Sequence, residues 1–479
     1  MHVTPRKTKT YIKTALKDSV LRRAVLNATG STVASRQAII DELPYWEDLR
    51  EKAHAIKKDV IKHLDTTLQT FEQRCTDNGI QVHWAADDQE ARQIILGIAE
   101  RNRVCKVVKS KSLTTEEIHL NSSLIDKGID TLETDLGEYI IQLMEQIPSH
   151  LIIPALHLTR KEIGKLFQEK LGNAYTEDPH ELLKIARRTL RQHFLSADMG
   201  ISGANFGIAE TGSICIVENE ANAHLTTTLP DIHVAVMGIE KLLPDFKALP
   251  YFLKLLPANA TGQKSSTFVN FISGPTHAKL GEGPKEMHVV LLDNGRSRIL
   301  QDPKLRQTLF CIRCASCLNS CPVYQQIGGH AYGWVYMGPI GITLIPQYLG
   351  ESVGKTSPYV CSLCTACRDA CPVKIDLPAH ILNLRSRLAA HGKTSRIERT
   401  GMRIWAFLAR HPRLYRFATW FPGKAQQLLP GGRSFPAPGY TRKRTLPRFD
   451  AQGFRKRFNT LQMPSAGQQT EHANSEDNR

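Results

Sequence analysis

The segments CIRCASCLNSCPV (residues 311–323) and CSLCTACRDACPV (residues 361–373) decide the C-terminal fold and its chemistry. Each has the spacing C-x2-C-x2-C-x3-C-P, and the second copy begins 50 residues after the first. Three cysteines spaced in this way aim three thiolates at one cubane, and the fourth, before proline, serves the other cluster. The spacing therefore predicts two [4Fe–4S] clusters, one on Cys311, Cys314, Cys317 and Cys371 and the other on Cys361, Cys364, Cys367 and Cys321.

Other uses of cysteine fit this pattern poorly. Structural zinc sites take four ligands in two pairs, often with His, and give no reason for a third Cys and a Cys-Pro in each copy. Disulfide frameworks belong to small secreted chains, and this chain has 479 residues. The remaining cysteines, Cys75, Cys105 and Cys215, are scattered, and we expect each to be a buried small apolar residue.

Oxygen-sensitive clusters and unpaired thiols indicate a reducing compartment. The first residues, MHVTPRKTKTYIK, lack the apolar core of a secretory signal. The sequence also has no run of about 18 apolar residues of the kind that spans a membrane. These features predict a cytoplasmic protein, either free or peripheral at the inner face of the membrane.

The net charge of +16 comes from one stretch of the chain. Residues 381–460 hold 18 Lys and Arg against two acids, Glu398 and Asp450, and the rest of the chain is neutral. Aromatic residues among these arginines fit a surface that docks the clusters on an acidic partner or on anionic lipid. A solvated cover over the protein's own acidic surface fits equally well. A nucleic-acid-binding regulator is disfavoured, because we expect no basic helix face and find no recognition motif.

The hydrophobic pattern predicts helices first and then alternating helices and strands. A helix is expected near residues 21–27, and one long helix should carry the apolar stripe of residues 46–71. Further helices are expected at residues 90–101, 136–146 and 179–194, and buried strands at residues 104–108, 151–155, 214–217, 232–237 and 289–292. This alternation predicts an α/β domain with a largely parallel sheet that ends near the turn at residues 293–295. A short helical lead at residues 298–309 and a helix at residues 379–390 should flank the cysteine copies.

The chain resembles the lactate utilization protein B family, the iron–sulfur subunit of a three-part L-lactate oxidation system. The resemblance rests on both cysteine copies and on ELPYWEDLREKA (42–53), VVKSKSLTTEEIHLN (107–121), ETDLGEYIIQL (133–143), GISGANFGIAETGSI (200–214) and GPKEMHVVLLDNGRS (283–297). It implies a LUD-type α/β domain, related to cyclo-ligases and CoA-transferases, followed by an all-α ferredoxin-type module. The expected division is an N-terminal helical region (1–75), the LUD domain (76–297), the two-cluster module (298–392), a basic aromatic region (393–460) and a disordered tail (461–479).

The segment GANFGIAETGS is the candidate ligand loop of the α/β domain. Its glycines would let backbone amides approach an anion, and Asn205, Glu210 and Thr211 would supply polar groups. A glycine-rich turn needed for its geometry alone is the alternative. Glu218 after the next expected strand, and Lys109 and Lys111 after an earlier one, are further candidates. For Glu218 an exposed acid at a strand end is the favoured interpretation, because such acids are common. For the lysine segment, simple helix capping from Ser112 is the alternative.

The resemblance implies an electron-transfer subunit that works with the other subunits of the lactate system and delivers electrons to a quinone pool or a carrier. The alternative is a stand-alone 2-hydroxy-acid oxidoreductase with its substrate in the LUD domain. The sequence identifies no catalytic residue for either function. It contains neither a Walker loop nor a dinucleotide-binding fingerprint.

Overall fold

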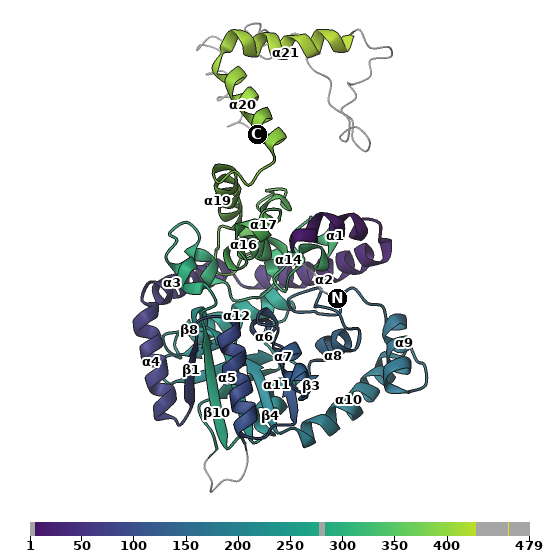
Figure 1. The fold of residues 1–479 in the computed structure, drawn as a ribbon, viewed down its shortest axis with the longest axis vertical. Coiled ribbons are helices and arrows are strands. Elements are labelled where there is room, and N and C mark those ends of the chain that lie inside the picture. The colour runs from purple at the N-terminus through teal and green to yellow at the C-terminus, as the bar shows by residue number, and fades with distance from the viewer. Residues whose placement is uncertain (1–4, 277–282, 428–457, 459–479) are drawn as a thin grey trace, which may run out of the picture. The chain divides into compact units, whose positions relative to one another are not determined.

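The structure is a computed structural model that describes residues 5–276, 283–427 and 458. The chain separates into two compact units, residues 1–393 and 394–479. The predicted disordered tail and part of the basic region lie outside the described residues. Within the first unit, Figure 1 shows a parallel sheet flanked by helices, with the short helices of the cysteine segments beside it.

The N-terminal region is helical, as predicted, but the apolar stripe lies on two helices. These are α3 (Trp46–Lys62) and α4 (Leu64–Asp77), and the prediction of one long helix is wrong. His63 leaves helical geometry between them, with φ −116° and ψ 37°. Each helix buries its own half of the stripe, so the pattern runs unbroken across a bend that no Pro or Gly marks. Before them lie α1 (Thr8–Ala15) and α2 (Ser19–Glu42), and α2 is much longer than the predicted segment.

The main sheet is fully parallel, with the strand order β1-β10-β7-β4-β2-β3. Its strands are β1 (Gln81–Ala85), β2 (Lys106–Lys109), β3 (Asp130–Glu133), β4 (Met199–Gly203), β7 (Ile232–Gly238) and β10 (Glu286–Leu292). The predictions of β2, β7 and β10 are confirmed. Strand β10 ends directly before the predicted turn, where Gly295 has φ 89°.

Helices cover both faces of this sheet. The helices that contact its strands include α5 (Asp88–Arg101), α7 (Leu120–Asp126), α8 (Leu136–Leu143), α10 (Pro179–Ser196) and α11 (Asn222–Thr228). Helix α9 (Arg160–Leu171) packs on α8 and α10, and α12 (Leu249–Ala260) packs on α2 and α3. The predicted helices correspond to α5, α8 and α10. One apolar core lies between the sheet, α5 and α7. A larger core on the other side continues without interruption into the cysteine segments.

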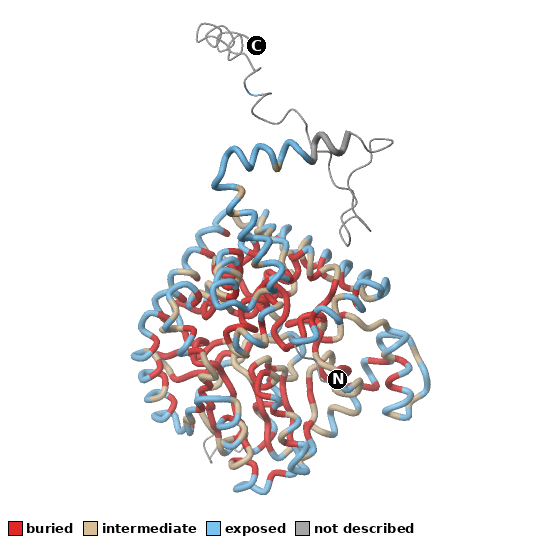
Figure 2. The backbone as a smooth tube through the Cα atoms, turned by 45° about the horizontal axis from the view of Figure 1, so that its top comes forward, coloured by how far each residue is buried: buried red, intermediate tan, exposed pale blue. Residues whose placement is uncertain are grey.

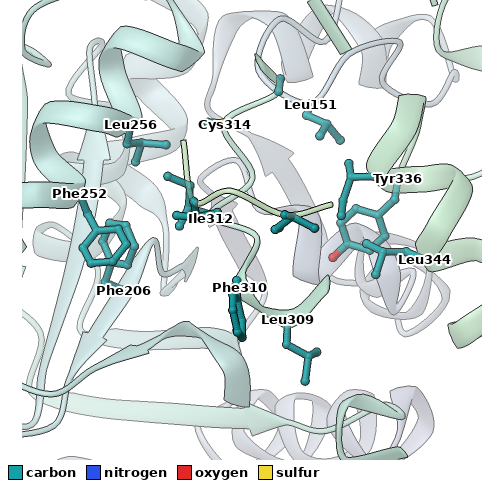
Figure 3. Close-up of a cluster of buried hydrophobic side chains, with 14 of the residues drawn as sticks. Leu151, Phe206, Phe252, Leu256, Leu309, Phe310, Ile312, Cys314, Tyr336 and Leu344 are labelled. Carbon is teal, nitrogen blue, oxygen red and sulfur yellow. The ribbon is translucent and has the colours of Figure 1, made fainter. Parts of the chain in front are cut away.

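Figure 3 shows this shared core, with Ile312 and Cys314 lying between Leu256 on one side and Tyr336 on the other. Figure 2 shows the same burial along the backbone, with the buried segments concentrated in the first unit. The α/β domain and the first cysteine copy therefore fold around one core. The position of that copy relative to the sheet is fixed by packing.

A second, smaller sheet has the order β8-β5-β6-β9, with β8 (Leu242–Leu243), β5 (Phe206–Ile208), β6 (Ser213–Glu218) and β9 (Phe268–Ile272). The prediction of β6 is confirmed. The predicted strand at residues 151–155 is wrong, because this run forms turns. The N–H groups of Ile152 and Ile153 both donate to Nδ1 of His150, and the N–H of Ser149 donates to the carbonyl of Pro154. The run is hydrophobic because it packs into the core as a folded loop.

All regular elements in residues 296–393 are helical, which confirms the predicted all-α module. They are α13 (Arg296–Leu300), α14 (Ser316–Asn319), α15 (Tyr324–Ile327), α16 (Gly338–Tyr348), α17 (Glu351–Gly354), α18 (Ala366–Asp369), α19 (Leu377–Ala390) and three short 3-10 turns at residues 306–310, 330–332 and 357–359. The predicted lead at residues 298–309 corresponds to α13 and the first of these turns. The predicted helix at residues 379–390 corresponds to α19.

The second unit contains two described helices, α20 (Arg396–Arg410) and α21 (Pro412–Gln427). Helix α20 buries none of its residues, and Figure 2 shows it as exposed. Its arginines at positions 396, 399, 403 and 410 share one face by helical spacing. The expectation that these arginines form no basic helix face is therefore wrong. Among the described helices, none has the length and apolar character needed to cross a membrane.

Candidate metal centre and adjoining cavity

The two cysteine copies adopt the same backbone conformation. Arg313 and Ala315 in the first copy have φ 61° and 63°, and Leu363 and Thr365 at the equivalent positions of the second have φ 58° and 67°. Positive φ is uncommon for residues other than glycine, and its recurrence at matching positions indicates a shape that the site requires. Each copy then enters a four-residue helix, α14 or α18, which carries its third cysteine.

Backbone N–H groups point at the cysteine sulfurs in matching places. The N–H of Arg313 donates to Sγ of Cys311 at 3.4 Å, and the N–H of Leu363 donates to Sγ of Cys361 at 3.3 Å. The fourth cysteines also accept from backbone N–H groups, although the donors differ in spacing. Tyr324, three residues on, donates to Cys321 at 3.5 Å, and Ile375, four residues on, donates to Cys371 at 3.3 Å. Such donors stabilise negative sulfur in a metal-bound thiolate.

The structure groups the cysteines across the two copies. Cys311, Cys314 and Cys317 line a small apolar cavity together with Cys371 from the second copy. In addition to burial, Cys361 and Cys364 raise the pKa of Cys321 of the first copy, and these three cysteines all raise the pKa of Cys367. Burial raises the pKa of Cys321 and of Cys371 to about 11. Thiols of this kind become thiolates on binding a metal, which replaces the proton.

The arrangement of sulfurs fits a cluster better than a single ion. A zinc ion gathers four donors at about 2.3 Å. The cysteine spacing in each copy is that of cubane ligands, and Cys311, Cys314, Cys317 and Cys371 surround the small apolar cavity. Cys364 is exposed and Cys361 is half-buried, whereas Cys314 and Cys317 are buried.

The cysteines outside the two copies differ from one another. Cys75 and Cys215 are buried, as predicted, and burial raises the pKa of each to about 12. Cys105 is exposed, and the prediction that it is buried is wrong. It lies just before β2, where its N–H donates to Asp198 at the surface.

A cavity of about 490 Å³ opens where the parallel strands β2, β3 and β4 end. The carboxyl ends of strands are where open α/β sheets bind ligands. Three of the candidate residues, Lys111, Asn205 and Glu218, line this cavity. The other three, Lys109, Glu210 and Thr211, are not among its lining residues. We call this space the main cavity.

The two parts of the glycine-rich loop have different surroundings. Its beginning, residues 203–205, lines the main cavity, whereas Glu210 and Thr211 lie in the turn between β5 and β6. There the amide of Asn78 donates to the carbonyl of Thr211 at 2.8 Å, and Glu210 accepts from the N–H of Phe246 at 3.3 Å. Gly212 has φ 64°, and a Cβ at this position would lie 2.5 Å from the backbone of Arg74. The turn is thus packed against α4.

Glu218 lines the main cavity, but its carboxylate already has partners. It accepts from the N–H groups of Ala223 at 2.7 Å and His224 at 2.8 Å, at the start of α11, and from the amide of Asn270 at 2.6 Å. These bonds fix the start of a helix whose first N–H groups lack partners within it. Lys111 donates to the carbonyl of Ile152 and so holds the loop that forms one wall of the cavity.

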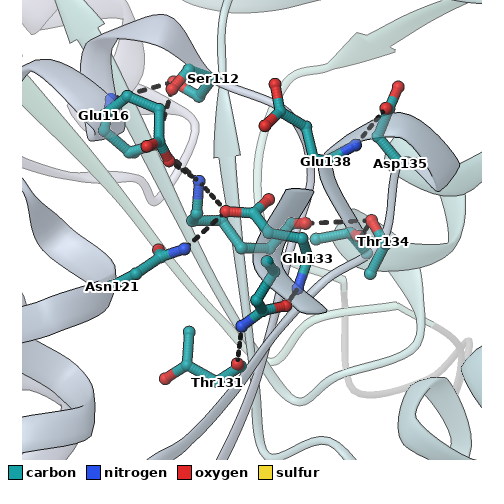
Figure 4. A network of polar contacts seen from close by, with 12 residues as sticks. Ser112, Glu116, Asn121, Thr131, Glu133, Thr134, Asp135 and Glu138 are labelled. Carbon is teal, nitrogen blue, oxygen red and sulfur yellow. Dashed lines mark hydrogen bonds and ion pairs between the residues drawn. The ribbon is translucent and has the colours of Figure 1, made fainter. Parts of the chain in front are cut away.

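Lys109 is fully buried behind this wall. Its ammonium lies 2.6 Å from Glu133 and 3.1 Å from Glu116, and it donates to the hydroxyl of Thr115 at 2.9 Å. Figure 4 shows Glu116, Glu133 and Asn121 converging in this network. Burial alone would lower the Lys109 pKa, but the two carboxylates outweigh burial and raise it. All three ammonium hydrogens have acceptors, so Lys109 holds β2, β3 and the short helix α6 (Leu113–Glu117) together.

The main cavity meets the cysteine cavity. Leu151 and Arg313 line both, and Lys241 and Tyr336 line the main cavity close by. Sequence reasoning missed Lys241, Arg313 and Tyr336. One signal was present, because Arg313 occupies the position between the first two cysteines that Leu363 occupies in the second copy.

A buried ion network joins the sheet to the cysteine segments at this point. Arg296 lies 2.9 Å from Glu117 and 2.6 Å from Glu240, and Nη2 of Arg313 lies 3.6 Å from Glu240. Tyr336 donates to Glu117 at 2.7 Å and packs under the guanidinium of Arg313, 4.6 Å from its ring centre. Burial would raise the Glu240 pKa, but Arg296 and Arg313 outweigh it and lower the pKa to about 2.

Comparisons with known proteins agree with this organisation. Residues 68–292 match the LUD domain, residues 307–375 the 4Fe–4S dicluster domain, and residues 386–462 the C-terminal domain of lactate utilisation protein B. The chain is 41% identical over 458 residues to the uncharacterized electron transport protein YkgF of Escherichia coli, covering 94% of this chain and 96% of that protein. It is 40% identical over 462 residues to lactate utilization protein B of Shouchella clausii, covering 95% and 97%. The Bacillus cereus protein of the same name is 39% identical over 463 residues, covering 93% and 97%.

Proposed function

This chain belongs to the lactate utilization protein B family, and from that membership we propose that it is the iron–sulfur subunit that receives electrons when L-lactate is oxidised to pyruvate. The relatives that carry this name match nearly the whole chain. The 4Fe–4S dicluster match covers both cysteine copies up to residue 375. Its partners are the other subunits of the lactate utilization system.

The observation that carries the proposal is the matched geometry of the two cysteine copies. Each has two positive-φ residues among its first three cysteines. Crossed ligand sets are supported by Cys371, which lines the cavity of the first copy's cysteines, and by Cys321, whose pKa is raised by burial and also by Cys361 and Cys364. We assign one [4Fe–4S] cluster to Cys311, Cys314, Cys317 and Cys371, and a second to Cys361, Cys364, Cys367 and Cys321. When bound, each cluster supplies a one-electron acceptor, and lactate oxidation releases two electrons and two protons.

The two cysteine groups differ in exposure, which suits a direction of transfer. The first group has three buried cysteines and the half-buried Cys311 and borders the main cavity, whereas the second includes the exposed Cys364. Electrons would enter near the main cavity and leave at the surface around Cys364. The acceptor there is a quinone pool or a carrier, reached through a brief surface encounter.

Anaerobically purified protein is expected to contain about eight iron and eight sulfide per chain, as two cubanes require. Iron and acid-labile sulfide analysis, with zinc measured on the same sample, tests this directly. About four iron per chain would indicate one cluster in place of two. Stoichiometric zinc with little iron would contradict it.

A second function is favoured by the position of the main cavity beside the cysteine cavity. In this alternative the chain oxidises a 2-hydroxy acid by itself, with substrate in the LUD domain. The cluster-loaded chain would then reduce an artificial acceptor with L-lactate in the absence of any other subunit. If turnover appears when the other subunits are added and is absent without them, the electron-transfer role stands and this alternative fails.

We further propose that α20 lies on an anionic membrane surface. Its arginines occupy one face, and Ile397, Ile404 and Trp405 occupy another, with exposed fractions of 88%, 56% and 60%. Helix α21 adds exposed aromatic residues, among them Phe417 and Trp420. Helices of this composition lie in the interface plane of a bilayer, and each basic residue near anionic lipid contributes about 1 kcal/mol.

Removing the chain after residue 393 is therefore expected to abolish binding to vesicles that contain anionic lipid while both clusters remain. Vesicle co-sedimentation and iron analysis check the two halves of this expectation. Neutral phosphatidylcholine vesicles and duplex DNA at physiological salt are the controls. Equal binding of the full-length protein to both vesicle types, or binding to DNA instead, would overturn the membrane assignment.

A further inference from the structure

Two cations lie at the end of the main cavity that adjoins the cysteine cavity. Lys241 follows β7, in the short 3-10 turn Ile239–Lys241, and Arg313 comes from the first cysteine loop. Both side chains are buried, with Lys241 8% and Arg313 9% exposed. They reach this point from opposite parts of the fold, one from the sheet and one from the cysteine module.

Lys241 makes no hydrogen bond or ion pair with any residue in the described part of the chain. Nearby buried cations differ in this respect. Lys57 donates to the carbonyl oxygens of Glu240 at 2.6 Å and Leu242 at 3.3 Å, and Arg296 pairs with Glu117 and Glu240. An unpaired ammonium is costly to bury, so an anion bound beside Lys241 would stabilise its charged form.

Arg313 also has unused donor capacity. Its Nη2 lies 3.6 Å from Glu240, while its Nη1 is buried without a hydrogen-bond partner in the described structure. Arg296 engages Oε2 of Glu240 at 2.6 Å, and Oε1 of Glu240, which faces Arg313, has no hydrogen-bond partner in the described structure. The two buried carboxylates, Glu117 and Glu240, thus lie among four buried basic side chains, Lys57, Lys241, Arg296 and Arg313. A further negative charge would reduce this excess of basic groups.

We propose that Lys241 and Arg313 bind the carboxylate of a 2-hydroxy or 2-oxo acid in the main cavity, next to the first cysteine group. The identity of the acid rests on the proposed function, whereas the anion site rests on the two cations. A guanidinium fork matches the two oxygens of a carboxylate. Apolar residues of the cavity wall, including Leu151, Ile152 and Leu256, suit the carbon chain of the acid. The volume of about 490 Å³ exceeds that of lactate and admits longer acids.

The other role open to these cations is to balance the charge of the cluster itself, since a cubane with four thiolates is anionic. The two roles differ in whether the cavity must bind a ligand. Charge balance requires no ligand, and it predicts that loss of Lys241 changes the cluster potential and leaves acid binding unaltered. A carboxylate site predicts the loss of binding.

The test is calorimetric titration of the oxidised, cluster-loaded full-length protein with L-lactate, pyruvate and inorganic phosphate. Lys241→Met removes the ammonium at similar length. Arg313→Leu copies the residue that the second cysteine copy carries at the equivalent left-handed position, Leu363, so the loop geometry is retained. Lys285→Met is the matched control, because this lysine is exposed and pairs with Asp231 at the surface. Iron content is measured for every variant.

We expect both cavity variants to keep their iron and to weaken lactate and pyruvate binding about tenfold or more, since each loses a charge-assisted contact. The control should bind as the wild type does. The inference is overturned if the wild type binds neither acid at about 1 mM, near the upper end of common KM values. It is also overturned if Lys241→Met binds both acids normally, or if phosphate binds as tightly as they do.

This result is independent of electron transfer. Acid binding without lactate-dependent cluster reduction in the assembled system would contradict the proposed function and leave the carboxylate site intact. Cluster reduction without acid binding to this chain would contradict the carboxylate site and leave the proposed function intact. It would place the lactate site in a partner subunit.

Discussion

Replacing Cys371 by Ser is expected to remove the cluster of the first cysteine copy, although Cys371 belongs to the second. Cys371 lines the same cavity as Cys311, Cys314 and Cys317. Serine oxygen is a poor ligand for iron that prefers soft thiolates. The iron content should therefore fall from about eight to about four per chain. Iron analysis and electron paramagnetic resonance of the reduced protein measure the loss.

Double variants separate crossed from uncrossed ligand sets. If Cys371 and Cys317 serve one cluster, Cys371→Ser combined with Cys317→Ser should still retain about four iron. Cys371→Ser combined with Cys367→Ser should lose nearly all iron, because each change then removes a different cluster. The reverse pattern would show that each copy holds its own cluster. Cys75→Ser is the control and should leave the iron content and both spectra unchanged, because Cys75 lies outside both groups.

Replacing Arg296 by Met is expected to lower the free energy of unfolding by about 3–5 kcal/mol, the cost of breaking a buried ion pair from one side. The change leaves Glu117 and Glu240 buried without their main cation. Arg296 also packs over the ring of Tyr348, 5.1 Å from its centre, in α16 of the cysteine module. Both the α/β domain and the module should therefore lose stability together.

Denaturant unfolding of the cluster-loaded protein, followed by circular dichroism and by cluster absorbance, tests this second expectation. Arg74→Met is the matched control, because Arg74 pairs with Asp77 at 3.7 Å and both side chains are about half exposed. Such pairs contribute about 0–1 kcal/mol. Equal effects of the two substitutions would contradict a structural role for the buried network. Separate transitions for the two probes would contradict the shared core.

Some of the strands can be predicted from the local hydrophobic pattern, and others cannot. Strands β7 and β10 are continuous apolar runs bounded by turns, so the sequence predicts them well. Strand β3, with the sequence DTLE, and β4, with MGISG, carry no such run. Strand β4 is paired on both sides, with β2 and β7, and β3 pairs with β2 at the edge of the sheet. The apolar run at residues 151–155 shows the opposite error. Leu151 and Pro154 are buried and Ile153 is exposed, and the backbone is satisfied by turn contacts such as that between Ser149 and Pro154.

Some residues of the candidate site can likewise be predicted from a local motif, and others are brought together only by the tertiary fold. Cysteine spacing is a local pattern, so a short motif is enough to predict two ligand sets, which stay a prediction. The cation pair could not be predicted, because Lys241 and Arg313 are 72 residues apart and meet only when the sheet and the cysteine module share a core. The choice among Asn205, Glu210 and Thr211 likewise depended on where the glycine-rich loop turns, which is decided by its packing on α4.

The measurement that most directly tests the central claim is lactate-dependent reduction of the clusters. This chain would be reconstituted anaerobically with the other subunits of the lactate utilization system, mixed with L-lactate and frozen for electron paramagnetic resonance. The account predicts that signals of both reduced clusters appear together with pyruvate, and that Cys371→Ser protein shows one signal of the two. Clusters that dithionite reduces but L-lactate leaves oxidised, while the complete system forms pyruvate, would contradict it.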